Sequence, residues 1–449
     1  ANILFLKLLS ENNEHNYWNS IKNQKDPDII GFINSYVIND IQKKYGGDVF
    51  TQLNITNPRT LREIIDRLDP LTLSTIDTDF KGDAFEYFLQ NTTSTENDLG
   101  EYFTPRHIVK TMVHLVNPRF KESIYDPFCG TGGFLTQAFK HIKESTILNA
   151  EQQEYLKKKT IFGGEITSTA RIAKMNMILQ GDGHSGVQKI NSLANPKDKE
   201  FDIVISNIPF SQKTKYSELY YNGISKNNGD ATCILHCLRS LKDGGRMALI
   251  MPEGFLYRGH LAEVRKFLLN NAKLQSVISL PQGVFLPYTM TKTDILYFTE
   301  ISKITNKHFF YFDVKNDGFS LNNRRKKIQG SNDLQVVNSA DFKDEKDTLS
   351  VGFNLVYLEE VKLNNYNLIG GQYAKKRGKT KYLEVRLEEV ILDIKDGGTP
   401  SRKKEEYFNG NINWCIVKDI KPEIWETKEK ISELGLKNSS AKIWPINSI

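Results

Sequence analysis

The sequence has few cysteines and no long apolar run, and each absence excludes a class of protein. Its 449 residues include only Cys129, Cys233, Cys237 and Cys415, which are too few and too scattered for a disulfide scaffold. No apolar run approaches the roughly 18 residues that a spanning helix needs, so an integral membrane protein is excluded. No secretory signal opens the chain, and we therefore expect a cytoplasmic protein. Because the first residue is Ala1 rather than Met, a fragment of a longer chain is an open interpretation.

A strong excess of one charge is also absent. Lys plus Arg number 60 and Asp plus Glu number 54, which gives a net charge of +6. So mild a balance neither requires nor excludes nucleic acid, because the positions of the cations decide the matter. Two basic clusters, 324–327 and 375–381, stand out, although a solvated loop is the simpler interpretation of either one alone. With 39% hydrophobic residues the chain can bury a large core, and its length predicts about three domains.

The pattern of apolar residues changes along the chain. Residues 1 to about 75 place them at three- and four-residue spacing, which predicts helices. From about Ser123, short β-rich runs alternate with helical stretches, which predicts a parallel, doubly wound α/β sheet with ligands at the carboxyl ends of its strands. The predicted strands are 123–126, 160–166, 201–207, 246–252, 274–280 and 293–299, and one more apolar run spans 308–314. The predicted helices are 134–144, 168–180, 231–241 and 261–270.

The sharpest motif is DPFCGTGGFL at residues 126–135, which follows a predicted strand and opens a predicted helix. Its glycines let the backbone approach a ligand closely, and a helix N-terminus offers free N–H donors. The dinucleotide fingerprint does not fit, because its third glycine falls on Leu135. A phosphate loop ending at residues 378–380 does not fit either, because its first glycine falls on Tyr373. What remains is Asp126 followed by Gly-x-Gly, a form that suits a ligand with an ammonium group.

The next predicted strand ends in Gly163-Gly164-Glu165. A ribose diol is usually held by an acid at the tip of the second strand, beside the glycine turn. A solvated surface glutamate is the alternative interpretation. The preceding strand and the glycine turn together favour ribose binding by Glu165.

A third motif, Asn-Ile-Pro-Phe at residues 207–210, begins at the end of the predicted strand 201–207. This combination suits an exocyclic amine on a flat ring, because the Asn207 side-chain oxygen and a nearby backbone carbonyl can accept its two hydrogens. Pro209 stiffens the turn, and Phe210 offers a stacking face for a base taken out of the duplex. An ordinary strand-to-loop turn is the alternative, but the position two predicted strands after Glu165 favours the catalytic interpretation.

In this order the motifs resemble the modification subunit of type I restriction–modification systems. That family consists of S-adenosylmethionine-dependent adenine-N6 DNA methyltransferases. The resemblance covers residues 1 to about 370 and also rests on the segments GEYFTP at 100–105, LKDGGR at 241–246, LPQGVF at 280–285 and KTDIL at 292–296. It implies a Rossmann-like methyltransferase sheet, S-adenosylmethionine as cofactor, and transfer of its methyl group to N6 of a flipped adenine at a specific DNA site.

The resemblance also implies the site residues. It assigns catalysis to Asn207, Ile208, Pro209 and Phe210. The cofactor-binding residues that it implies are Glu101, Tyr102, Phe103, Thr104, Pro105, Arg106, Asp126, Gly130, Thr131, Gly132, Gly133, Glu165 and Asn191, without a metal. Two positions depart from the family pattern: Ile208 stands where proline is usual, and Asn191 stands where an acid is expected to pair with the cofactor's adenine. Asp182 competes with Asn191 for the second role.

The last segment, 383–449, resembles the start of a target-recognition domain of the type I specificity subunit. This resemblance rests on residues 396–401 and on Trp414 with 417–420. It implies that modification and specificity regions are fused, with the basic segment 375–381 at the joint as a candidate for phosphate contacts. The expected domains are an N-terminal helical domain at 1–75, the methyltransferase domain at 76–300, a C-terminal extension and linker at 301–380, and the start of an α/β target-recognition domain at 381–449. The expected partners are double-stranded DNA and specificity and restriction subunits or regions, with a homo-oligomer left open and no membrane.

Other interpretations stay open. Ile208 and Asn191 are compatible with a weakly active or inactive DNA-recognition scaffold that binds S-adenosylmethionine. Cytosine N4 or a protein glutamine amide would also suit an Asn-x-Pro-aromatic loop, although the recognition-like segment argues against a protein substrate. Cys233, His236 and Cys237 suggest a metal, but no second ligand pair lies nearby in the sequence, which favours a buried structural role.

Overall fold

The structure is a computed structural model that describes most of the chain. The described residues are 2–11, 16–47, 49–73, 103–181, 184–220, 228–299, 301, 307–373, 391, 397–421 and 423–445. The chain divides into two compact units, residues 1–375 and 376–449. Among the described residues, none of the helices combines the length and the apolar character that a membrane span requires.

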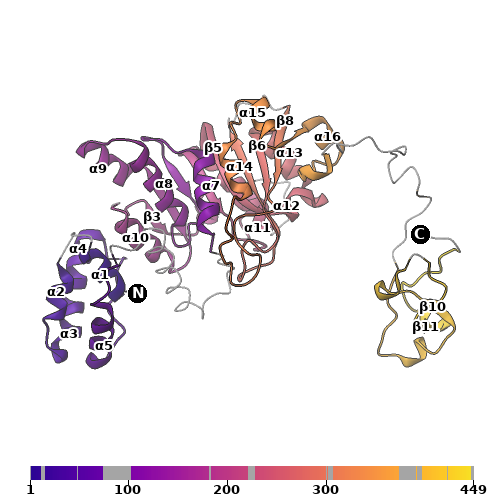
Figure 1. The fold of residues 1–449 in the computed structure, drawn as a ribbon, viewed down its shortest axis with the longest axis horizontal. Coiled ribbons are helices and arrows are strands. Elements are labelled where there is room, and N and C mark those ends of the chain that lie inside the picture. Colours follow the sequence, from indigo (N-terminus) through magenta and orange to yellow (C-terminus); the bar gives the residue numbers. More distant parts are fainter. Residues whose placement is uncertain are drawn as a thin grey trace. The chain divides into compact units, whose positions relative to one another are not determined.

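The N-terminal region of the first unit is helical (Figure 1). Its elements are α1 (Asn2–Glu11), α2 (Tyr17–Lys22), α3 (Asp26–Phe32), the π-helical η1 (Ile33–Val37), α4 (Ile38–Tyr45) and α5 (Pro58–Leu68). Their apolar faces form one core, which includes the fully buried Phe5 and Ile41. Ile172 and Met175 of α10 (Ala170–Leu179) join the same core, so the helical region packs against the remainder of the first unit through this helix.

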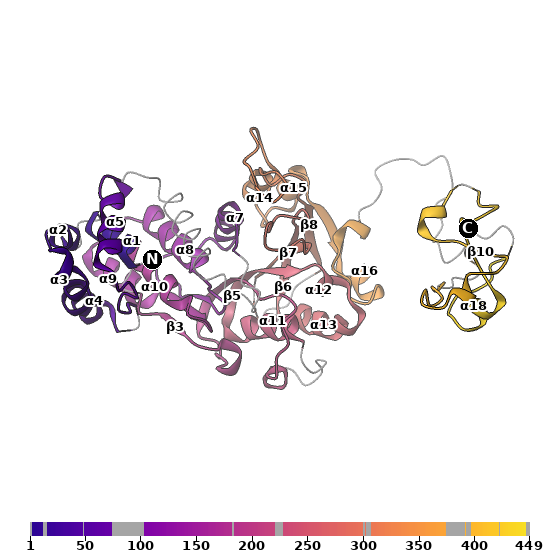
Figure 2. The ribbon, with the colours of Figure 1, turned by 90° about the horizontal axis from the view of Figure 1, so that it is seen from below.

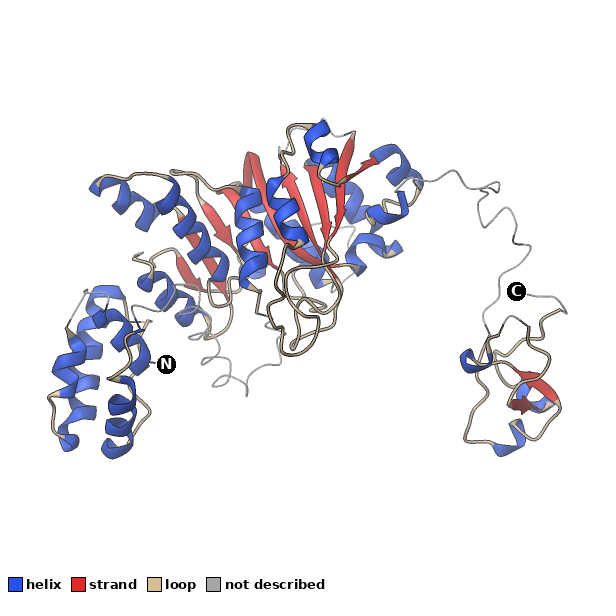
Figure 3. Ribbon diagram, in the orientation of Figure 1, coloured by secondary structure: helices blue, strands red, loops and turns tan. Residues whose placement is uncertain are grey.

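Within the described residues, nine strands of the first unit form a single sheet in the order β3-β2-β1-β4-β5-β7-β6-β8-β9 (Figure 3). The strands are β1 (Ile124–Asp126), β2 (Ile161–Glu165), β3 (Val187–Lys189), β4 (Phe201–Asn207), β5 (Leu241–Pro252), β6 (Lys273–Ser279), β7 (Thr293–Thr299), β8 (His308–Asp313) and β9 (Asn354–Tyr357). Every predicted strand overlaps one of these. The central strands are buried almost throughout, which explains why they read as continuous apolar runs.

The sheet differs from the expected parallel one in the direction of two strands. β7 lies antiparallel to both β5 and β6, and β9 lies antiparallel to β8. An apolar run predicts a strand but not its direction, which depends on whether the connection returns directly or crosses over the sheet. Two strands, β3 and β9, were not predicted at all, because β3 is a three-residue edge strand with two exposed residues and β9 is only four residues long.

Helices cover both faces of this sheet (Figure 2). On one side lie α7 (Arg106–Val116), α8 (Gly133–Ser145) and α14 (Asp333–Ser339), and on the other lie α11 (Gly229–Ser240) and α13 (Ala262–Asn271). The remaining helices and 3-10 turns of the first unit are α9 (Ala150–Lys159), η4 (Ser192–Ala194), η5 (Ser217–Leu219), α12 (Gly254–Tyr257), η6 (Gly259–Leu261), α15 (Glu345–Ser350), α16 (Leu358–Leu363) and η7 (Gly370–Tyr373). This two-sided covering is the doubly wound arrangement that the sequence predicts.

Residues 308–373 belong to the same core as the strands β1 to β7. Phe309 and Val356 are fully buried in the cluster that also contains Ile205 of β4. The fully buried Arg265 of α13 holds this region by donating to the carbonyl oxygens of Asn365 and Tyr366, at 3.0 and 2.6 Å. The expected extension and linker is therefore largely an integral part of the sheet. The sequence did not predict this packing, because the few apolar residues that pack are separated by polar, Asn- and Lys-rich stretches without a clear period.

The second unit is small and has its own two-stranded sheet. β10 (Ile412–Trp414) pairs antiparallel with β11 (Glu429–Ile431), and the short helix α18 (Glu433–Lys437) and the turns η8 (Glu405–Tyr407) and η9 (Val417–Asp419) accompany them. Trp414 donates its indole N–H to the Gly398 carbonyl at 3.2 Å, and the Arg402 guanidinium lies 5.4 Å from its ring. These interactions use two of the segments that resemble a target-recognition domain.

Candidate active site

Three predicted site residues end three neighbouring parallel strands. Asp126 ends β1, Glu165 ends β2 and Asn207 ends β4, and β1 pairs with the other two strands. The chain leaves β1 towards β2 on one side and reaches β4 on the other, which makes this the switch point of the sheet. Ligands of doubly wound folds bind in the crevice at such a point.

The glycine turn between β1 and α8 is held by hydrogen bonds from three directions. Cys129 donates its N–H to the Gly164 carbonyl at 3.0 Å, and Asn176 of α10 donates its side-chain amide to the Thr131 carbonyl at 2.8 Å. The third bond, from the Gly130 N–H, is accepted by a carboxylate on the next strand. Gly132 has a φ of +82° immediately before α8 begins, and a Cβ there would lie 3.3 Å from the Cβ of Ala173. The turn therefore requires glycine at this position for both backbone and packing reasons.

Asp126 is a buried acid with few compensating interactions. Its Oδ1 accepts the Ser206 hydroxyl at 2.6 Å and the Phe128 N–H at 3.1 Å. Burial raises its pKa to about 7, against the effect of these two hydrogen bonds and with a further contribution from the charge of Glu165. A cationic group brought next to this carboxyl would favour the ionised form, which is the chemistry that the sequence predicts for it.

Glu165 has a structural role that the sequence did not predict. Its Oε2 accepts the Gly130 N–H at 3.1 Å, and its Oε1 accepts the N–H and the hydroxyl of Thr167 at 2.8 and 2.9 Å. The carboxylate thus joins the glycine turn to the loop after β2. Any diol that it holds is placed relative to both segments.

Asn207, in the predicted catalytic loop, has one side-chain atom bonded and one without a partner in the described part of the chain. Its Nδ2 donates to the Thr104 hydroxyl at 3.0 Å, whereas its Oδ1 is buried without a hydrogen bond. A buried acceptor without a donor costs about 1–3 kcal/mol. The bond to Thr104 fixes the amide orientation and leaves Oδ1 for a donor supplied by a ligand.

The rest of the catalytic loop is packed. Ile208 is 1% exposed, and its N–H donates to the Ile250 carbonyl at 3.4 Å. Phe210 is 5% exposed and meets Phe285 edge to face, with 6.2 Å between the ring centroids. Phe285 belongs to the family-like segment 280–285, but the motif pattern gave it no role. Stacking of a base on Phe210 stays a prediction, because the ring is covered by protein in this structure.

The segment before α7 links the catalytic loop to the glycine turn. Thr104 binds Asn207, as described above, and Arg106 lies beside the start of α8, where a Cβ at Gly133 would be 3.5 Å from its Nη1. Its guanidinium also lies 5.9 Å from the Phe103 ring centroid. Pro105 provides the N-cap of α7. Glu101 and Tyr102, which were also predicted, lie outside the described residues.

Asn191 lies near the glycine turn but already uses its side chain. Its Oδ1 accepts the Ala194 N–H at 3.3 Å, which caps η4, and the neighbouring Ser192 donates to the Pro127 carbonyl at 2.7 Å. The competing Asp182 lies outside the described residues. Ser192 was not predicted, and neither were Asn176, Thr167 and Ser206, because these residues support the site without belonging to a motif.

The Cys-His group on α11 is part of the core. Cys233, His236 and Cys237 are fully buried, and His236 pairs through its ring nitrogens with the hydroxyls of Tyr220 and Tyr125, at 2.9 and 3.3 Å. Burial lowers the pKa of His236 to about 4. In the ranges covered by the structure, no three His, Cys, Asp or Glu side chains are grouped so that they could hold a metal ion.

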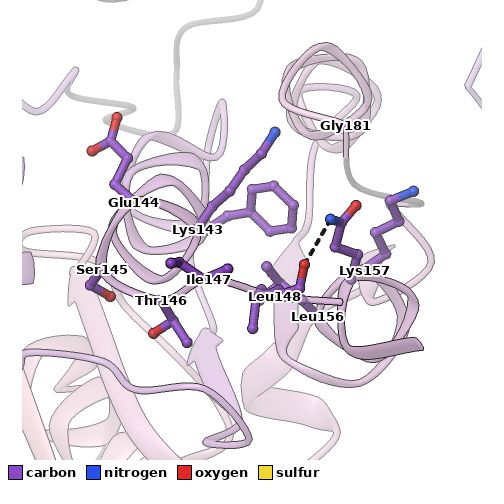
Figure 4. Close-up of a pocket in the computed structure, with 11 residues that line it drawn as sticks. Lys143, Glu144, Ser145, Thr146, Ile147, Leu148, Leu156, Lys157 and Gly181 are labelled. Carbon is purple, nitrogen blue, oxygen red and sulfur yellow. Dashed lines mark hydrogen bonds between the residues drawn. The ribbon is translucent and has the colours of Figure 1, made fainter. Parts of the chain in front are cut away.

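A pocket of about 330 Å³ lies away from this site, at the C-terminal end of α8 (Figure 4). Lys143, Ile147, Leu156 and Lys157 are among its lining residues. Because α8 begins at the glycine turn and has 13 residues, its far end is about 18 Å away. The pocket therefore takes no part in the chemistry of the strand ends.

The doubly wound sheet, with a glycine turn after β1, an acid after β2 and an Asn-x-Pro-Phe loop after β4, defines the class of Rossmann-like methyltransferases. The chain belongs to the N-6 DNA methylase family, whose sequence model matches residues 76–381. It is 30% identical over 331 residues to the type I restriction enzyme StySPI methylase subunit of Salmonella potsdam and 32% identical over 277 residues to the EcoEI methylase subunit of Escherichia coli.

These two alignments cover 67% and 58% of this chain. The chain spans only 62% and 55% of the lengths of those relatives. Among solved structures, a chain of a type I restriction–modification system matches with a TM-score of 0.61 and 25% identity, over 83% of this chain and 82% of that one. The family match ends at residue 381.

Proposed function

We propose that the protein is a site-specific DNA methyltransferase that transfers a methyl group from S-adenosylmethionine to N6 of a flipped adenine, as the modification part of a type I restriction–modification system. The observation that carries this proposal is the buried Asn207 Oδ1 without a hydrogen bond. This atom lies at the carboxyl end of β4. The neighbouring strand β1 ends in Asp126 and the glycine turn, which we propose to hold the cofactor. Family membership and the type I relatives support the proposal.

The residues of the glycine turn fit S-adenosylmethionine. Asp126 offers a buried carboxyl whose ionised form a cationic neighbour would stabilise, and Glu165 lies at the strand end where a ribose diol is usually held. Asn191, Thr131 and the 101–106 segment are the other predicted contacts. When bound, S-adenosylmethionine supplies a sulfonium methyl group, and the protein's contribution is to place the acceptor opposite it.

The catalytic loop prepares the amine. Asn207 Oδ1 accepts one hydrogen of the adenine N6, and the backbone carbonyl of Ile208 accepts the other. Two acceptors for its hydrogens draw the nitrogen towards tetrahedral geometry. Its lone pair is then less delocalised into the ring and can point towards the methyl group. Pro209 keeps the loop rigid. No general base is needed, because the amine loses its proton after the new bond has formed, and proximity supplies much of the acceleration.

The proposed partners follow from the same family. Double-stranded DNA is the substrate, and specificity and restriction subunits or regions complete the system, with a homo-oligomer left open and the cytoplasm as the place of action. We propose that residues 381–449 are the start of a target-recognition domain fused to the modification region. The basic segment 375–381 that would join them lies outside the described residues.

A second candidate function is a scaffold that binds cofactor and DNA but transfers slowly or not at all. Two observations favour it: Ile208 replaces the usual proline, and the Asn191 oxygen is occupied by the η4 cap. Methylation of cytosine N4 is the alternative within enzymes.

A labelled-methyl assay separates these functions. The full chain is incubated with labelled S-adenosylmethionine and unmethylated genomic DNA, and the modified nucleoside is identified after digestion. N6-methyladenine at a defined sequence is the expected product. N4-methylcytosine would establish the cytosine activity, and binding of the cofactor without any transfer to DNA would establish the scaffold.

A further inference from the structure

The basic cluster at 324–327 lies on an ordered hairpin. We call residues 318–328 the basic hairpin. Its arms are joined by two backbone bonds, from Ser320 to Lys326 and from Ile328 to Gly318, both 2.8 Å, and by an antiparallel bridge between Phe319 and Lys327. Because the hairpin follows β8, which runs parallel to β6, it emerges at the same edge of the sheet as the predicted site.

The hairpin presents three cations to solvent. Arg324, Lys326 and Lys327 are exposed, and in the described part of the chain none of them forms an ion pair. The sequence from Gly318 to Asn332 contains no acid that would neutralise them. Three like charges on one short turn repel one another, and an anion bound there would relieve that repulsion.

Arg325, the fourth cation, anchors the turn instead. It adopts a φ of +42°, and its side chain is only 12% exposed where it pairs with the fully buried Asp317. Asp317 also pairs with His107 Nε2 at 2.9 Å, and the His107 ring stacks on Phe319 with 4.4 Å between centroids. A loop that is merely solvated at the surface does not need a buried ion pair and an aromatic stack to hold it.

The anchor connects the hairpin to the catalytic loop. His107 lies in the first turn of α7, three residues after Thr104, which binds the Asn207 side chain at 3.0 Å. The positions of the exposed cations are therefore fixed relative to Asn207 through one short segment. The hairpin can place a charged strand at a defined distance from the base that Asn207 receives.

We propose that the basic hairpin binds the phosphate backbone of the DNA that carries the target adenine. This rests on the proposed function for the identity of the polyanion. Phosphate contacts position a protein on DNA without reading its sequence. Arg324, Lys326 and Lys327 therefore contribute affinity and register, while specificity lies elsewhere.

The test compares two full-length variants with the same change in net charge. One carries Arg324→Gln, Lys326→Gln and Lys327→Gln. The control carries Lys157→Gln, Lys158→Gln and Lys159→Gln at the end of α9, which leads into the opposite, amino edge of the sheet at β2. Binding to a fluorescent duplex is measured by anisotropy over a range of salt concentrations.

The hairpin variant is expected to flatten the slope of log affinity against log salt by up to about 2.7, which is about 0.9 for each phosphate that the protein no longer neutralises. The decrease in affinity should be equal on duplexes with and without the target site. A third variant, Arg324→Lys with Lys326→Arg and Lys327→Arg, should retain the wild-type slope. Unchanged binding of S-adenosylmethionine by all variants serves as the control for folding.

The proposal is overturned if the hairpin variant keeps the wild-type slope, if the α9 control flattens the slope as much, or if the wild-type chain binds no duplex at low salt. A preference of the hairpin for single-stranded RNA or an acidic peptide over the duplex overturns it as well. The methyl assay is read separately. A flattened slope without methyl transfer would leave the hairpin proposal standing and remove the proposed function, whereas transfer with an unchanged slope would do the reverse.

Discussion

The ends of β1 and β2 differ from the end of β4 in how their polar groups are satisfied. Asp126 and Glu165 accept hydrogen bonds from Ser206, Phe128, Gly130 and Thr167 within the protein itself. Asn207 instead has one atom held by Thr104 and the other, Oδ1, buried without a donor. The proposed cofactor side, at the ends of β1 and β2, is thus built by internal bonds, while the proposed catalytic side, at the end of β4, keeps one acceptor unsatisfied.

This difference separates stability from activity. Replacing a residue whose polar atoms are bonded within the protein should change both stability and cofactor binding. A buried acceptor without a donor destabilises the free protein and gains its partner only from the ligand. Substitutions at the two places should therefore change different measurements, and the following predictions start from the largest effect.

Asn207→Ala should have the largest effect, on the chemical step alone. Removal of Oδ1 removes one of the two proposed acceptors for the N6 hydrogens, and loss of one such polar group commonly lowers kcat by about 100- to 1000-fold. The dissociation constant for S-adenosylmethionine should stay at the wild-type value. Single-turnover methyl transfer and calorimetric titration measure the two quantities.

The melting temperature supplies a further check on Asn207. The variant loses the bond to Thr104 but also loses a buried atom without a partner, so the net change in stability should be small. If Asn207→Ala transferred methyl groups at the wild-type rate, or no longer bound the cofactor, the proposed separation of catalysis from cofactor binding would be contradicted.

Asp126→Asn should lower affinity for S-adenosylmethionine by about 10- to 100-fold, because a hydrogen bond to a charged group is worth about 1.5–3 kcal/mol. The same substitution should increase the stability of the cofactor-free protein at neutral and higher pH. Burial raises the pKa of Asp126 from 3.8 to about 7, so the folded protein binds its proton more tightly than the unfolded chain does. Stability from this residue is then present below pH 4 and is lost as the pH rises towards 7.

The neutral asparagine keeps an oxygen that can accept from Ser206 and Phe128. Because it does not titrate, its contribution to stability does not depend on pH. Relative to wild type, the variant should gain up to about 4 kcal/mol in free energy of unfolding between pH 4 and pH 8, which is the equivalent of a three-unit shift. Urea unfolding at the two pH values without cofactor measures this. A difference that does not change with pH would mean that Asp126 is ionised and stabilised in the free protein.

The same comparison explains how much the sequence predicted. The strand ends, the glycine turn and Asn207 were predictable because each combines a strand pattern with a distinctive short motif. Thr167, Asn176 and Ser192 were not, because an isolated polar residue in a loop or helix has no pattern until the fold brings it to a carbonyl or carboxylate. The antiparallel β7 and the anchor between His107 and Asp317 were missed for a related reason, since both depend on contacts between distant segments.

Gly132→Ala tests the internal construction of the cofactor side with a smaller effect. Alanine at a φ of +82° costs about 1–2 kcal/mol, and its methyl group would lie 3.3 Å from the Cβ of Ala173. We expect a lower melting temperature and weaker cofactor binding together. Gly31→Ala in α3 is the matched control, because no atom lies within 4 Å of its Cβ position, and it should gain about 0.5–1 kcal/mol. Equal effects of the two substitutions would show that the turn is not strained.

Ile208→Pro should have the smallest effect, and it addresses the departure from the family pattern on the catalytic side. The substitution removes an N–H whose bond to the Ile250 carbonyl is long, 3.4 Å, and one carbon of a side chain that is 1% exposed. Asn207 precedes it in extended conformation at the end of β4, which is compatible with a following proline. We expect a loss of about 1 kcal/mol in stability.

Activity should change little in the same variant, because the proposed role of residue 208 belongs to its backbone carbonyl, which proline retains. Methyl transfer by Ile208→Pro and wild type, measured side by side with the cofactor affinity of each, decides the matter. A large increase in kcat without a change in affinity would show that turn stiffness, and not only the position of the acceptors, limits the reaction. The wild-type chain would then resemble the slow scaffold that Ile208 suggests.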